Sequence, residues 1–173
     1  ASPGNDEVLV VGYGNGLRSD DGVGRAVAER LADDPRLAGA TVLSLHQLTP
    51  ELAVDISRAA VVVLVDAVLG GRPGEITVGR LATAGASAAG ASATSFTHHL
   101  DAASLVALAT GLFGGHPRVH LVTVAGATMD VGDQLSPIVA AALPRAVQTV
   151  IDVALGSTVA ADRTERERVA AHA

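Results

Sequence analysis

Three residue types that often carry structure or chemistry are missing from this sequence of 173 residues: cysteine, lysine and tryptophan. The lack of cysteine excludes disulfides, a thiol nucleophile and any zinc site built on cysteine. The lack of lysine excludes a phosphate-binding loop of the Walker type, which ends in lysine. Aromatic residues make up 2% of a chain that is 49% hydrophobic, so the core must consist of valine, leucine and alanine.

Basic residues are scarce as well, because 12 arginines stand against 18 acidic residues and give a formal net charge of −6. They form no run or stripe, which argues against nucleic acid as a partner. No apolar run approaches the length of a membrane span, and the first residues are polar, unlike a secretory signal. We therefore expect a cytoplasmic protein that binds no membrane and acts as a monomer.

Apolar runs alternate with helical patterns along the chain. The patterns predict strands at 8–11, 40–45, 61–65, 75–78 and 119–124. They predict helices at 22–33, from near Asp101 and at 134–155, and a further helix that Thr49 caps and that has Pro50 at its first position. The last helix is expected to turn Ile138, Ala141, Ala142, Val147, Val150 and Ile151 inward. This order predicts a three-layer α/β/α sandwich with a mostly parallel sheet of about five strands. We expect one domain at 1–155, a flexible loop at 82–95 and a charged, frayed tail at 156–173.

The most informative stretch is VLVVGYGNGLRSDDGVG at residues 8–24. A short apolar strand breaks at a glycine-rich loop, and two carboxylates, Asp20 and Asp21, precede the next helix. A dinucleotide site is one interpretation, but Leu17 occupies the place of the third glycine that its fingerprint needs. His46 also stands where a ribose-binding acid is expected at the end of the second strand, so we expect no nucleotide.

Several polar residues are predicted to meet at one edge of the sheet. Asp20 and Asp21 are at helix-capping positions, and Asp66 follows the buried run 61–65. His98 and His99 precede the helix expected from Asp101. Because the carboxyl ends of parallel strands converge, Asp21, Asp66 and His98 are expected close together. Carboxylates and imidazole form a ligand set suited to a divalent ion such as nickel or zinc.

These motifs resemble those of the hydrogenase maturation proteases, the endopeptidases that remove the C-terminal tail from the precursor of the nickel–iron hydrogenase large subunit. The stretch GYGNGLRSDDGVG, the VDA at Asp66 and the Thr97-His98 pair stand in the family's order, over roughly residues 8–155. The resemblance implies that Asp21, Asp66 and His98 bind nickel and carry the reaction, with His99 as an alternative to His98. It also implies that Asn15 and Asp20 shape and support the loop.

The resemblance further implies that nickel arrives with the precursor as part of the substrate. Hydrolysis of the peptide bond would then use a water molecule activated by the metal or by a carboxylate. The HQLTPEL segment at 46–52 departs from the glycine-rich turn of several relatives and resembles a subgroup that acts on soluble hydrogenases. A metal-binding maturation chaperone that does not cleave its partner is the alternative function.

Overall fold

The computed structural model describes residues 7–83 and 101–156, and its centre is a single five-stranded sheet in the order β2-β1-β3-β5-β4. The strands are β1 (Val8–Tyr13), β2 (Thr41–Leu45), β3 (Val61–Val68), β4 (Ile76–Leu81) and β5 (Arg118–Ala125). The first three and β5 run parallel, whereas β4 lies antiparallel to β5 at the edge. The predicted mostly parallel sheet is confirmed, and so is the edge position of the strand expected at 75–78.

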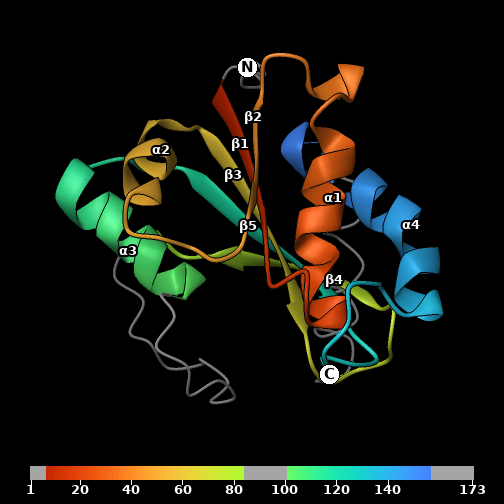
Figure 1. Ribbon diagram of the computed structural model, residues 1–173. Helices are drawn as coiled ribbons and strands as arrows, with labels where there is room; N and C mark the ends of the chain where they lie inside the picture. The colour runs from red at the N-terminus through yellow and green to blue at the C-terminus, as the bar shows by residue number, and fades with distance from the viewer. Residues whose placement is uncertain (1–6, 84–100, 157–173) are drawn as a thin grey trace, which may run out of the picture.

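Helices cover both faces of this sheet (Figure 1). One face carries α1 (Val23–Leu31) and α4 (Pro137–Ala154), and the other carries α2 (Leu52–Arg58) and α3 (Ala102–Phe113), with short 3-10 turns at Ser19–Gly22 and Pro35–Leu37. Successive side chains of a strand point to opposite faces. Val8 and Val10 of β1 therefore pack with α1 and α4, while Leu9 and Val11 pack with α2 and α3. The three-layer sandwich predicted from the sequence is confirmed.

Helix α2 begins later than the sequence indicates. Its α-helical residues start at Leu52 rather than at Pro50, and Thr49 contributes its backbone carbonyl instead of a capping side chain. The amides of Leu52, Ala53 and Val54 donate to carbonyls three residues earlier. That spacing is the tighter 3-10 pattern, so the first turn precedes the α-helix proper.

The predicted inner face of helix α4 is confirmed for Ala142, Val147, Val150 and Ile151 but not for two other residues. Ile138 is 50% exposed and Ala141 is also exposed, so both are wrong as inner residues. The residues that pack inward are Val139, Ala142, Leu143, Ala146, Val150, Ile151 and Ala154. The helix starts at Pro137, three residues later than predicted.

Contrary to the sequence expectation, α4 alone among the described residues is long and apolar enough to cross a membrane, with 18 residues and a mean hydropathy of 1.3. Length and composition are weak evidence, because core helices pass the same test. In this fold the helix packs its apolar stripe against the sheet, as a core helix does.

The glycines of the loop let α1 pack directly across the ends of β1 and β3. A Cβ atom on Gly12 would collide with the backbone oxygen of Gly24, and one on Gly24 would collide with the backbone of Tyr13 and Val65. Only residues without a side chain permit such a close approach of two backbones. This contact fixes where α1 starts, and with it the two acids that precede the helix.

Candidate functional site

Asp20 is a structural carboxylate with no exposed surface. Its oxygens accept hydrogen bonds from the backbone N–H groups of Ala127 (2.8 Å), Thr128 (3.1 Å) and Ser136 (2.7 Å), and from the Ser136 hydroxyl (2.8 Å). Burial alone would raise the pKa of Asp20, but these hydrogen bonds outweigh burial and hold the pKa below its ordinary value. Asp20 thus ties the glycine loop to the loop before α4.

The prediction that Asp20 and Asp21 cap the following helix is wrong. Neither the 3-10 turn that contains them nor α1 has a side-chain cap. Asp21 instead accepts a hydrogen bond from the backbone N–H of Asn15 at 2.8 Å. The Asn15 side chain in turn accepts from the N–H of Leu17 at 2.9 Å. The supporting role expected of Asp20 and the loop-shaping role expected of Asn15 are both visible in these contacts.

Asp66 lies inside strand β3, which continues three residues further than the predicted 61–65, to Val68. Gly12 of β1 is paired with Val65 of β3, so the next residues, Tyr13 and Asp66, are neighbours at the carboxyl ends of the two central strands. Both point to the face that α2 and α3 cover. The Tyr13 hydroxyl donates a hydrogen bond to the Asp66 carboxylate, and Asp66 Oδ1 accepts from the N–H of Ala67 at 2.8 Å.

The surroundings of Asp66 give it an unusual acidity. Burial raises its pKa to about 6, against the lowering effect of the hydrogen bonds from Tyr13 and Ala67, and the charge of Asp21 raises it further. The pKa of the Tyr13 hydroxyl is also raised, by burial first, then by Asp66 and by the charge of Asp101. The two carboxylates that the sequence assigned to the site are therefore within electrostatic reach of each other.

The histidine of the predicted site lies outside the described residues, as do His99 and most of the predicted loop at 82–95. Within 7–83 and 101–156, no group of three or more His, Cys, Asp or Glu side chains is placed to hold a metal ion. The three-residue nickel site stays a prediction. Asp101, the first residue described after the histidines, caps α3 by accepting from the Ser104 N–H, and the predicted start of a helix near Asp101 is confirmed.

Tyr13 is the site residue that the sequence interpretation missed. It is the single tyrosine of the chain and stands between the first two glycines of the loop. Its partnership with Asp66 depends on the register of β1 against β3, which periodicity does not reveal. One feature of the sequence could have indicated the pairing: Tyr13 and Asp66 each follow a buried apolar run at the end of a strand.

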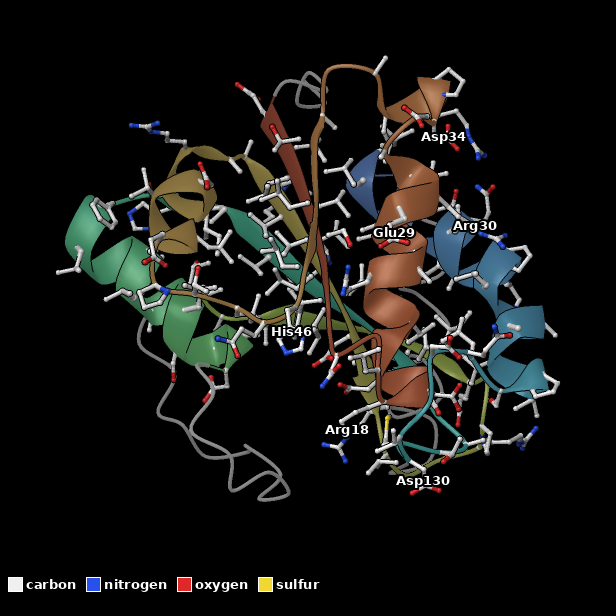
Figure 2. The ribbon with its side chains drawn as sticks, viewed as in Figure 1. Arg18, Glu29, Arg30, Asp34, His46 and Asp130 are labelled. Carbon is white, nitrogen blue, oxygen red and sulfur yellow. The ribbon has the colours of Figure 1, made fainter. Side chains whose placement is uncertain are left out.

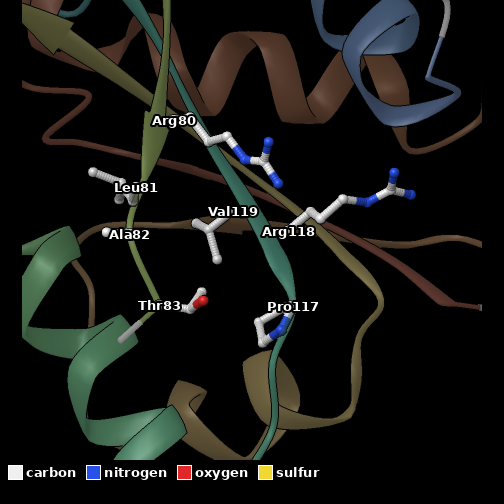
Figure 3. A pocket seen from close by; sticks show the side chains of 7 residues that line it. All are labelled: Arg80, Leu81, Ala82, Thr83, Pro117, Arg118 and Val119. Carbon is white, nitrogen blue, oxygen red and sulfur yellow. The ribbon is translucent and has the colours of Figure 1, made fainter. Parts of the chain in front are cut away.

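A cavity is found at each end of the sheet in the part of the chain that the structure describes. The first, of about 440 Å³, lies beside the glycine loop and includes Asn15, Arg25 and His46 in its lining. Figure 2 shows His46 and Arg18 at the end of the molecule where β1 enters this loop. The second, of about 320 Å³, is lined by Arg80 and Arg118 among others (Figure 3).

The cavity of Figure 3 is remote from the two acids. Arg118 is paired with Val61, five residues before Asp66 along β3. At about 3.3 Å per residue, the two positions are roughly 16 Å apart. The candidate site is therefore the carboxyl edge of the sheet. Its carboxylate oxygens suit a divalent cation, and a carboxyl group with a pKa of about 6 suits proton transfer near neutral pH.

No known protein-family model and no curated protein sequence matches the chain. Solved structures do match its fold. The [NiFe] hydrogenase maturation protease HycI from Thermococcus kodakarensis is 21% identical with a TM-score of 0.67, over 86% of this chain and 92% of that one. HybD from the same organism, also a [NiFe] hydrogenase maturation protease, is 24% identical with a TM-score of 0.63, over 86% and 99%.

The hydrogenase maturating endopeptidase HybD from E. coli is 20% identical with a TM-score of 0.64, over 83% of this chain and 89% of that one. These matches cover most of both chains in each case. The protein therefore has the fold of the hydrogenase maturation proteases.

Proposed function

We propose that the protein is an endopeptidase that removes the C-terminal extension from the nickel-loaded precursor of a [NiFe]-hydrogenase large subunit. The observation that carries the proposal is the coupled pair Asp21 and Asp66 at the carboxyl edge of the sheet. Asp21 belongs to the loop whose sequence resembles the maturation proteases. Solved proteins of the same fold are named hydrogenase maturation endopeptidases and proteases, which supports the same activity here.

In this proposal Asp21, Asp66 and His98 bind the nickel ion that the precursor carries, so nickel is part of the substrate. The position of Asp101 supports the inclusion of His98. The charge of Asp101 acts on Tyr13, which contacts Asp66. His98 precedes Asp101 by three residues, so chain connectivity alone keeps their Cα atoms within about 11 Å. His99 is the alternative ligand.

Binding of the nickel ion would bring the scissile peptide bond to the carboxylates. Asp66 is mostly ionised at neutral pH because its pKa is about 6, yet it is more basic than an ordinary aspartate. Once nickel is bound, the metal or one of the carboxylates would activate the water molecule that attacks the peptide carbonyl carbon. The C–N bond then breaks, and a proton passes to the departing amine. We propose that the protein does this as a monomer in the cytoplasm.

The test is incubation of the purified protein with two forms of the precursor, one loaded with nickel and one free of it, followed by mass spectrometry. The expected result is loss of the C-terminal extension from the nickel-loaded form alone. If the protein forms a complex with the nickel-loaded precursor but leaves its mass unchanged, it is a maturation chaperone that does not cleave. Equal cleavage of both forms would overturn recognition through nickel.

A further inference from the structure

The groove beside the glycine loop is built as an extension of the candidate site. Its lining includes Asn15, Gly16, Leu17, Arg25, His46 and Asp133, and its volume is about 440 Å³. Asn15 connects it to the site, because the Asn15 backbone N–H donates to Asp21 at 2.8 Å. The loop that lines the groove is therefore tied directly to the Asp21 carboxylate.

One wall of the groove is a fixed polar network on α1 and β2. Arg25 donates through Nε to the Ser44 hydroxyl (3.4 Å), and its Nη2 lies 3.7 Å from Glu29. Ser44 in turn donates to Glu29 at 3.1 Å. The remaining guanidinium nitrogen, Nη1, has no hydrogen-bond acceptor among the residues that the structure describes. It lies next to Gly16, where a Cβ atom would be 3.5 Å from it.

The opposite wall is rigid, because two loops are hydrogen-bonded to each other there. The N–H of Ser19 donates to the Gly132 carbonyl (2.8 Å), and the N–H of Gly132 donates to the Leu17 carbonyl (3.0 Å). Leu17 is nevertheless 69% exposed. An exposed leucine held in place at this rim offers an apolar contact to a chain that lies in the groove.

The floor of the groove is open because Gly16 has no side chain. Gly16 does not have a positive φ, and a Cβ atom there would meet nothing nearer than Arg25 Nη1. A larger residue is thus compatible with the fold, although it would project into the groove. The glycine is not demanded by the backbone, and an open path for another chain explains it.

We infer that this groove binds the segment of the precursor next to the scissile bond, as an extended peptide. The peptide main chain crosses Gly16, one of its carbonyl oxygens accepts a hydrogen bond from Arg25 Nη1, and an apolar side chain rests on Leu17. An extended peptide has free carbonyl groups and a narrow cross-section, which match an unpaired guanidinium N–H and a glycine floor. The inference rests on the proposed function.

The test compares four proteins in a cleavage assay with the nickel-loaded precursor: wild type, Gly16→Leu, Arg25→Gln and Gly111→Leu. Gly111 is the matched control, because it lies on α3 outside the groove lining and a Cβ atom there meets nothing within 4 Å. Gly16→Leu is expected to raise KM at least tenfold and Arg25→Gln three- to tenfold, with kcat changed less than threefold. Gly111→Leu should keep the wild-type KM. Circular dichroism and thermal melting confirm that each variant is folded.

An unchanged KM in Gly16→Leu, or a loss confined to kcat, would overturn the inference while leaving the proposed function intact. Failure of the wild type to cleave would overturn the proposed function instead. In that case the affinity of wild type and Gly16→Leu for the nickel-loaded precursor, measured by titration, still decides whether the groove binds it. At least tenfold weaker binding by Gly16→Leu supports the groove, and equal binding rejects it.

Discussion

Asp66→Asn should make the protein more stable at neutral and alkaline pH. Burial raises the pKa of Asp66 from 3.8 to about 6 in the folded protein, so the folded state holds this proton more tightly than the unfolded chain does. The stability of wild type therefore falls as pH rises from about 4 to about 6, and the full cost of the ionised group is present above that range. The amide of asparagine carries no charge and retains an oxygen that accepts from Tyr13 and Ala67.

The magnitude follows from the same shift in pKa. At about 1.4 kcal/mol per pH unit, moving the pKa from 3.8 to about 6 corresponds to a cost of about 3 kcal/mol as an upper bound. We expect Asp66→Asn to raise the free energy of unfolding by roughly 1 to 3 kcal/mol at pH 8 and by under about 1 kcal/mol at pH 4. The free energy of unfolding is measured from urea transitions at both pH values. The exposed Asp55→Asn is the control and should stay within about 0.5 kcal/mol of wild type. Destabilisation at pH 8, or an equal gain at both pH values, would refute the reasoning.

Three further predictions concern the same end of the molecule. Asp20→Ala should lower the free energy of unfolding by about 2 to 4 kcal/mol, because it leaves buried N–H groups of the 127–136 segment unpaired. Urea unfolding transitions measure this change, and Asp130→Ala, at an exposed residue that lacks these contacts, is the control. Tyr13→Phe should raise the pKa of Asp66 above 6, since the hydrogen bond from Tyr13 lowers it; an NMR titration of the Asp66 carboxyl carbon measures this, and an unchanged pKa contradicts it. A chelator should leave the melting temperature of the free protein almost unchanged, because the described core is aliphatic and separate from the acids; a shift of several degrees in calorimetry would indicate a structural metal.

The elements of the fold were predictable where the sequence contains uninterrupted apolar runs. Strand β3 is buried on both faces, so its five apolar residues from Val61 to Val65 identify it without any periodicity. The face of α4 was less predictable. Ile138 and Ala141 are as apolar as the residues that pack inward, so hydrophobicity alone does not show that they face away from the sheet.

The site was predictable as far as residue types at strand ends allow. Asp21 and Asp66 are within electrostatic reach of each other because parallel strands bring their carboxyl ends together. The hydrogen-bond partners of Asp20 could not be predicted from the sequence, since Ala127 and Ser136 are more than 100 positions away from it. The contact of Tyr13 with Asp66 likewise depends on strand register, and the role of Gly16 depends on the groove that surrounds it.

The central claim is that Asp21, Asp66 and His98 together recognise the nickel carried by the precursor. The most direct measurement is the cleavage rate of the nickel-loaded precursor with wild type, Asp21→Asn, Asp66→Asn, His98→Ala and His99→Ala, each shown to be folded. Asp21→Asn, Asp66→Asn and His98→Ala are expected to lose cleavage at least a hundredfold, while His99→Ala cleaves at the wild-type rate. Cleavage at the wild-type rate by Asp21→Asn or Asp66→Asn, or loss in His99→Ala with full activity in His98→Ala, would contradict it.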